Sequence, residues 1–287
     1  MLVDVHIVDA FTLDGIGGNP AGIVLEADHL TREQRQIIAA KTGLSETAFV
    51  SSSDVADIRL EFFTPSRQIA HCGHATIATF ALLQQRGYLE GKTSSSKETV
   101  DGIRHIILDG TKVLMEQRAP VFTRMPEPEI AEVAAAAGLD LENVKAMTIG
   151  NTGNGFLLLE LHDVSALQDM IPFEEHVRTI SERHGIIGFY PFVTMPSGDV
   201  AAMARMFAPA YGIVEESATG MAAGPLACYL HCKGAKKGGQ YLIEQGRYMH
   251  QSTPSLLEAH LQTKDGLITS LTVGGNATMR KTLTFSI

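Results

Sequence analysis

The residue best suited to proton transfer in this sequence is Glu46, in the segment GLSETAFV at 43–50. It is the only ionisable residue of a segment that predicts a strand. Because strand side chains alternate, Glu46 shares a face with apolar neighbours such as Leu44 and Ala48. An apolar surrounding favours the protonated carboxyl, which can accept a proton in one step and return it in the next. The alternative is a carboxylate at a strand entrance that pairs with a basic side chain.

His74 and Cys72 form a second group capable of chemistry, in the segment CGHATIA. A neutral imidazole in the first turn of a helix can exchange hydrogen bonds with a ligand. His71 beside them and the pair Cys228 and Cys232 offer metal-ligand types. Cysteines four apart share one apolar helix face, however, where a free thiol is usually a buried hydrophobe. We therefore predict no metal site.

A thiol at a helix N-terminus also has a lowered pKa, and two opposed thiols can racemise a carbon without a cofactor. The segment EESATGM at 215–221, which corresponds to the one around Cys72, contains no cysteine. We therefore do not expect a two-thiol racemase. Glu216 in that segment is either an acid stabilised by the dipole of the following helix or a second proton-handling group opposite Glu46.

Small residues open an apolar helix once in each half of the chain, at CGHATIA and at TGMAAG (219–224). Gly and Ala leave the amides of a first helical turn uncovered, and the dipole adds positive potential there. Each helix start therefore suits an anion such as a substrate carboxylate. Two such ends predict two halves that face one ligand.

The elements that position these residues alternate between strands and helices. We expect helices near 31–41, 74–86, 129–137, 174–184 and 219–232, and strands near 2–8, 46–51, 57–63, 103–109, 112–118, 144–149, 155–161, 189–195 and 200–207, with four further strands after 232. The polar stretch 92–99 predicts an exposed loop, and three prolines at 120–128 predict a linker.

These elements predict an α+β fold of two halves, each a sheet around a central apolar helix, with a cleft between them. The N-terminal half spans 1–125, and the strand at 277–287 is expected to pack back on it. The C-terminal half spans 126–276.

Composition narrows the class of protein. Of 287 residues, 45% are hydrophobic and 19% charged, as in a folded globular chain. The net charge of -9 argues against nucleic acid as a partner, since that binding needs clustered Lys and Arg. The start of the chain reads as a strand and not as a signal peptide, and no apolar run is long enough to span a membrane. With three cysteines, we expect a cytoplasmic protein with reduced thiols.

Five ordered motifs, spread over almost the whole chain, resemble the phenazine-biosynthesis PhzF-like isomerases. They are GNPAGIV (18–24), LSETAFV (44–50), FTP (63–65), CGHAT (72–76) and RMFAP (205–209). The family is similar in fold to diaminopimelate epimerase, with two α+β halves. Its members are commonly homodimers, so the resemblance implies a homodimer here.

The resemblance also assigns roles within the site. It implies that Glu46 is the acid/base glutamate of an isomerase without metal or organic cofactor, and that His74 is the site histidine. It implies that the substrate, a small anionic metabolite, is bound by the residues at the two helix starts and in one loop: Asn19, Cys72, Gly73, Thr219, Gly220 and Met221.

The chain departs from the phenazine enzyme where that pattern has Glu-Asp-Pro-Ala-Thr-Gly-Ser. Glu216 stands at the Asp position and Met221 at the Ser position. The thioether removes a donor that could hold a polar substrate, so we expect a different small carboxylated metabolite. The alternatives are a binding protein that retains the cleft without the chemistry, and a one-thiol epimerase that uses Cys72.

Overall fold

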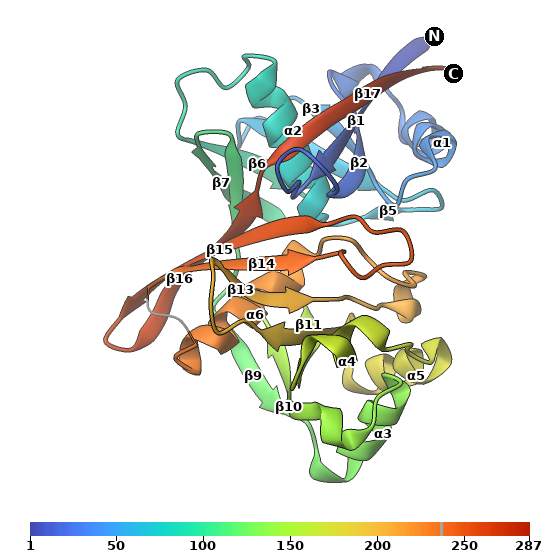
Figure 1. Cartoon of the computed structure of the whole chain (residues 1–287). Coiled ribbons are helices and arrows are strands. Elements are labelled where there is room, and N and C mark those ends of the chain that lie inside the picture. Colours follow the sequence, from blue (N-terminus) through green and yellow to red (C-terminus); the bar gives the residue numbers. More distant parts are fainter. Residues whose placement is uncertain (236–237) are drawn as a thin grey trace. The chain divides into compact units, whose positions relative to one another are not determined.

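The chain divides into two compact units (Figure 1). The computed structural model describes residues 1–235 and 238–287. Unit 1 comprises Met1–Glu116 with Gly274–Ile287, and unit 2 comprises Gln117–Val273. The C-terminal strand β17 (Ala277–Ser286) pairs antiparallel with β1 (Leu2–Ala10), within unit 1.

A curved sheet surrounds the apolar helix α2 (Gly73–Gln85) in unit 1. Its strand order is β17, β1, β2, β3, β4, β6, β7, β8. The further bounds are β2 (Asn19–Val24), β3 (Thr47–Ser51), β4 (Ile58–Phe63), β5 (Gln68–Ile69), β6 (Ser94–Thr99), β7 (Gly102–Asp109) and β8 (Lys112–Glu116). Helix α2 contacts β17 and β8, at opposite ends of this order, as well as β1, β2 and β3. The sheet therefore wraps the helix, whose residues from His74 to Leu83 are all buried.

Helix α1 (Arg32–Thr42) packs on the other side of these strands. Thr31 and Gln34 form a capping box at its start, and Gly43 ends it in the left-handed conformation at φ 67°. Ile38 and Ala39 join an apolar cluster with β1 and β3. This packing fixes the turn that leads from Gly43 into β3, the turn that carries Glu46.

Unit 2 repeats the arrangement around helix α6 (Gly220–Cys232). Its strands run β9, β10, β11, β12, β13, β14, β15. The bounds are β9 (Val121–Arg124), β10 (Val144–Asn151), β11 (Gly155–Leu161), β12 (Gly188–Thr194), β13 (Val200–Ala204), β14 (Gln240–Gln245), β15 (Ser255–Lys264) and β16 (Leu267–Gly275), with helices α3 (Ile130–Ala136), α4 (Val164–Asp169) and α5 (Glu174–His184). Helix α6 contacts β10, β11, β14 and β15, so this sheet curves around it as well.

Two sequence-based expectations are wrong. The polar stretch 92–99 is not an exposed loop, because it contains β6, in which Ser95, Lys97 and Thr99 are buried. Asp57 accepts hydrogen bonds from the Ser95 hydroxyl (2.8 Å) and the Ser96 amide (2.9 Å). Polar contacts such as these stabilise the strand, so its sequence lacks the alternating apolar residues from which a strand is usually predicted. The proline-rich stretch 120–128 likewise contains β9, which pairs antiparallel with β10.

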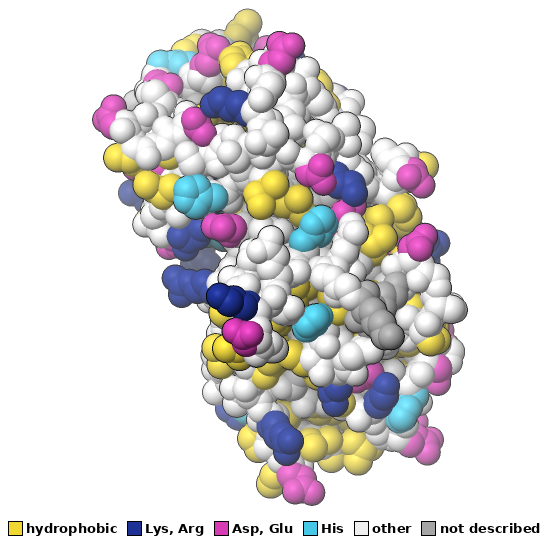
Figure 2. Space-filling view, turned by 90° about the vertical axis from the view of Figure 1, so that its left-hand side faces the viewer, with side chains coloured by type: hydrophobic (Ala, Val, Ile, Leu, Met, Phe, Trp, Pro, Cys, Tyr) yellow, Lys and Arg dark blue, Asp and Glu magenta, His cyan; other side chains and the backbone are white. Residues whose placement is uncertain are grey.

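On the face shown in Figure 2, Lys and Arg side chains are interspersed with Asp and Glu. Within the described ranges, no helix has both the length and the apolar character needed to cross a membrane.

Candidate active site

Unit 1 brings Glu46, His74 and Cys72 together. Glu46 directly precedes β3, and its carbonyl accepts a hydrogen bond from the Gly22 amide of β2 at 3.1 Å. Its side chain is 15% exposed, and Oε2 lies 3.4 Å from Nε2 of the buried His74. The other ring nitrogen, Nδ1, lies 3.6 Å from Sγ of Cys72. The imidazole thus lies between a carboxylate and a thiol, two groups that can take part in proton transfer.

The start of α2 holds two of these three groups. Cys72 is the N-cap residue in an extended conformation, Gly73 is the first helical residue and His74 the second. The Thr76 hydroxyl donates to the Cys72 carbonyl at 2.6 Å and fixes this turn. Among the described residues, no side-chain hydrogen bond caps the helix at Cys72. The positive end of the helix dipole therefore lies at the turn that holds Cys72 and His74.

Asn19 lies on the neighbouring strand. It is the first residue of β2, is buried, and pairs with Ala10 of β1. Gly18 before it has φ +89°, and a Cβ there would lie 2.7 Å from the Ala10 carbonyl. Only glycine fits this turn, which leads into the strand that binds the Glu46 backbone.

Glu46, Cys72 and His74 each offer a metal-ligand atom, and these atoms lie within 4.8 Å of one another. A metal ion held by all three residues would need one imidazole nitrogen, the thiolate and the carboxylate to point at the same position. Here Nδ1 faces the sulfur and Nε2 faces the carboxylate, and the lone pairs of these nitrogens point in different directions. An ion bound at one of these nitrogens would therefore lie away from one of the other two groups.

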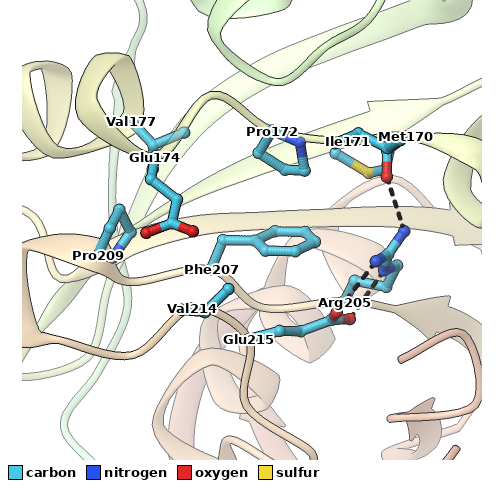
Figure 3. Close-up of a pocket in the computed structure, with 10 residues that line it drawn as sticks. All are labelled: Met170, Ile171, Pro172, Glu174, Val177, Arg205, Phe207, Pro209, Val214 and Glu215. Atoms are coloured by element: carbon cyan, nitrogen blue, oxygen red, sulfur yellow. Dashed lines mark hydrogen bonds and ion pairs between the residues drawn. The ribbon is translucent and has the colours of Figure 1, made fainter. Parts of the chain in front are cut away.

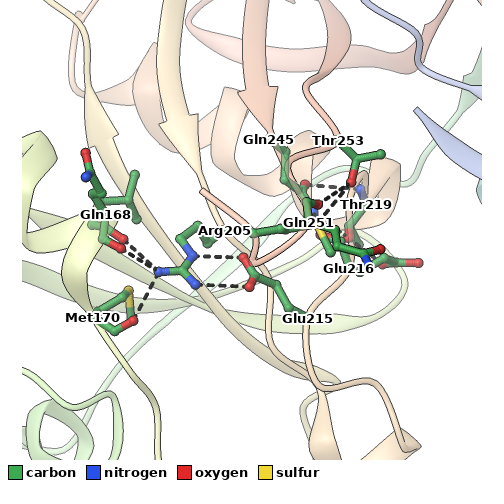
Figure 4. Close-up of polar contacts among 11 residues, drawn as sticks. Gln168, Met170, Arg205, Glu215, Glu216, Thr219, Gln245, Gln251 and Thr253 are labelled. Carbon is green, nitrogen blue, oxygen red and sulfur yellow. Dashed lines mark hydrogen bonds and ion pairs between the residues drawn. The ribbon is translucent and has the colours of Figure 1, made fainter. Parts of the chain in front are cut away.

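Unit 2 places Glu216 and Thr219 side by side at the start of α6 (Figure 4). The Thr219 hydroxyl donates to the Glu216 carboxylate. Gln245 makes hydrogen bonds to both residues. Its Nε2 donates to the Glu216 carbonyl at 2.6 Å and to Thr219 Oγ1 at 3.1 Å. Its Oε1 accepts a hydrogen bond from the Thr219 amide at 3.1 Å. Burial and the charge of Glu216 raise the pKa of Tyr190, whose hydroxyl donates to Gln245. Glu216 is thus held at the helix start, and its part in proton transfer stays a prediction.

Gly220 and Met221 are the first two residues of α6. The Gly220 carbonyl accepts from Nε2 of Gln117 at 2.8 Å, and Met221 Sδ lies 3.6 Å from Nδ2 of Asn154. The predicted site residues therefore form two groups, one in each unit. Gln245 and Gln117, which position the second group, carried no signal in the sequence.

Arg205 has a structural part in unit 2 (Figure 4). Its guanidinium donates to both oxygens of Glu215, at 2.8 and 3.0 Å. It also donates to three carbonyls between 3.0 and 3.2 Å, those of Leu167, Gln168 and Met170. Arg205 directly follows β13, so its side chain connects the end of β13 to the end of α4.

A pocket of about 190 Å³ opens beside Arg205 (Figure 3). Its lining is Met170, Ile171, Pro172, Glu174, Val177, Arg205, Phe207, Pro209, Val214 and Glu215. None of the predicted site residues lines it, although Arg205, Phe207 and Pro209 belong to the RMFAP motif.

Known proteins resemble this chain over nearly its whole length. Residues 8–282 match the family described as phenazine biosynthesis-like protein. An uncharacterized isomerase, YddE, of Escherichia coli O157:H7 is 32% identical, with 96% of each chain covered. A trans-2,3-dihydro-3-hydroxyanthranilate isomerase of Pseudomonas chlororaphis is 29% identical, with 94% of each covered.

The fold is similar too. The crystal structure of a PhzF-family phenazine biosynthesis protein of Bacillus anthracis superimposes with a TM-score of 0.89, at 30% identity over all of both chains. The predicted α+β class is confirmed. The family resemblance stated from the motifs is confirmed as well: the chain belongs to the phenazine biosynthesis-like (PhzF) family and is an isomerase.

Proposed function

We propose that this isomerase moves a proton on a small carboxylated metabolite, with Glu46 as base and then as acid, and without a metal or organic cofactor. The observation that carries the proposal is the largely buried Glu46 carboxylate, 3.4 Å from the His74 imidazole. Glu46 would take a proton from one carbon of the substrate and return it to another. The substrate keeps its atoms and electrons, so no redox partner enters the balance.

The helix starts support an anionic substrate. The amides that follow Cys72 in α2 can hold a carboxylate while Glu46 acts on a carbon nearby. The Pseudomonas chlororaphis relative is named trans-2,3-dihydro-3-hydroxyanthranilate isomerase, and that name supports a carboxylated ring as the substrate class. Met221 lacks the hydroxyl of the phenazine enzyme's Ser, which argues for a less polar substrate than that enzyme's.

A thiol epimerase is the second candidate, and the 3.6 Å contact between Cys72 Sγ and His74 Nδ1 favours it. In that case the sulfur would exchange the proton with the substrate carbon. Cys72→Ala separates the two: it leaves most of the turnover of a Glu46 isomerase but abolishes that of a thiol epimerase.

Deuterium wash-in tests the proposal. The wild type and Glu46→Gln are incubated in D2O with small carboxylated metabolites, including trans-2,3-dihydro-3-hydroxyanthranilate, and carbon-bound deuterium is read by mass spectrometry. Incorporation by the wild type that is lost in Glu46→Gln supports it, and Glu90→Gln, at an exposed carboxylate, is the matched control. Equal incorporation by Glu46→Gln contradicts it. Ligands that raise the melting temperature without incorporation would favour a binding protein.

A further inference from the structure

The pocket beside Arg205 lies wholly within unit 2, apart from the predicted site residues (Figure 3). Four of the side chains that line it are apolar and buried: Met170, Val177, Phe207 and Pro209. Its volume of about 190 Å³ exceeds the roughly 150 Å³ of an engineered apolar cavity that binds benzene. The pocket therefore has room for one aromatic ring or a branched aliphatic group.

Apolar side chains at the mouth of the pocket are exposed to solvent. Ile171 is 79% exposed and Val214 is 61% exposed, and both line the pocket. Phe173, which lies between the lining residues Pro172 and Glu174 in the chain, is 58% exposed. Large apolar side chains that gather in the open around a cavity are typical of a binding surface. A molecule bound there would remove Ile171 and Val214 from water, which favours binding.

The charged side chains of the lining leave one negative charge without a counter-charge. Arg205 and Glu215 neutralise each other, because the guanidinium donates to both carboxylate oxygens. Arg205 also lies 4.9 Å from the ring centre of Phe207, within cation–π range. Glu174, in the first turn of α5, has no hydrogen-bond or ion-pair partner within the described ranges, and its carboxylate extends toward Phe207 (Figure 3). The uncompensated charge of the lining is therefore that of Glu174.

We propose that this pocket binds a small organic ammonium ion whose body is an aromatic ring or a branched aliphatic chain. The hydrocarbon part would contact Met170, Val177 and Phe207, and the ammonium group would reach the exposed Glu174 carboxylate at the mouth. A contact between two charged groups is stronger than one between neutral groups. A carboxylated ligand is disfavoured here, because Glu174 would repel it. The pocket and its ligand are independent of the proposed function, since that substrate is an anion bound elsewhere.

Binding of 2-phenylethylammonium tests the proposal, followed by NMR of protein labelled with carbon-13 at the methionine methyl groups. Met170 lines the pocket, and Met170→Leu assigns its signal. Because an aromatic ring shifts the signals of nearby methyl groups, we expect a saturable shift of Met170, with a Kd on the order of 1 mM for a ligand of this size. Met279, in unit 1, should not shift. Phenylacetate has the same ring and the opposite charge, and it should bind at least about tenfold more weakly.

Substitutions of Glu174 test the source of the selectivity. Glu174→Gln keeps the size of the side chain and should weaken binding of 2-phenylethylammonium about three- to fivefold, as expected for an exposed carboxylate. Glu174→Lys reverses the charge and should abolish binding. Glu182→Gln, at an exposed carboxylate further along α5, is the matched control and should keep the wild-type Kd.

Three results would overturn the proposal. The first is a Met170 signal that stays in place at concentrations of 2-phenylethylammonium well above the expected Kd. The second is equally tight binding of phenylacetate, and the third is an unchanged Kd in Glu174→Gln. All the substituted glutamates are exposed, so the variants should fold and each result can be read directly.

Discussion

Replacing Lys97 by methionine should change the pH dependence of stability in a defined direction. Lys97 has a pKa of about 7 in the folded protein, lowered by burial, against an ordinary value of 10.5. Between these values the unfolded chain binds the proton and the folded chain does not. The free energy of unfolding of the wild type therefore rises with pH over this window and falls as the pH drops toward 7.

The magnitude follows from the width of the window. Each pH unit contributes about 1.4 kcal/mol, so the charged lysine costs the wild type about 3 kcal/mol between pH 9.5 and pH 7. Methionine has a similar length and no charge, so Lys97→Met does not incur this cost. The variant lacks the hydrogen bonds that Lys97 makes to Thr76 and His71. This loss lowers its free energy of unfolding by an amount that does not change with pH over the window.

Urea denaturation of both proteins, followed by circular dichroism at half-unit steps from pH 6 to 9.5, measures the difference. We expect the stability of Lys97→Met relative to wild type to increase by about 3 kcal/mol as the pH falls from 9.5 to 7, and to level off below 7. Lys92→Met, at an exposed lysine paired with Asp57, should give a flat difference. A flat difference for Lys97→Met would show that Lys97 keeps an ordinary pKa in the fold and would refute the reasoning.

Other substitutions test buried contacts in both units. Because burial holds the pKa of His71 at about 3, the wild type should lose about 2 kcal/mol between pH 6.5 and 4.5 that His71→Phe does not lose, which acid denaturation measures. In Gly188→Ala the new Cβ would lie 2.1 Å from the Phe207 carbonyl, so urea denaturation should reveal a loss of about 3 kcal/mol; an unchanged midpoint would contradict this contact. Arg205→Met leaves Glu215 and three carbonyls without their donor, and a loss of about 3 to 5 kcal/mol is expected by the same method.

The local parts of the site could be predicted from the sequence, because they depend on neighbours in the chain. Small residues after Cys72 and Thr219 predict helix starts, and the structure begins α2 and α6 there. The apolar character of both helices on every face predicts that a sheet surrounds each one, as contacts within each unit show.

The short distance between Glu46 and His74 could not be predicted from the sequence. It depends on the register of β2 against β3, in which the Gly22 amide binds the Glu46 carbonyl, and on the packing of α2 against both strands. Lys97 was missed for a different reason. Its strand is built from Ser, Lys, Glu and Thr, whose buried members are satisfied by hydrogen bonds, so polarity suggested a loop.

The most direct test of the central claim compares the rates of deuterium transfer to one identified substrate by the wild type and Glu46→Gln. If Glu46 carries the proton, the variant should transfer deuterium about 100 to 10,000 times more slowly, while Glu90→Gln matches the wild type. A Glu46→Gln protein that is folded and transfers deuterium at the wild-type rate would contradict the account.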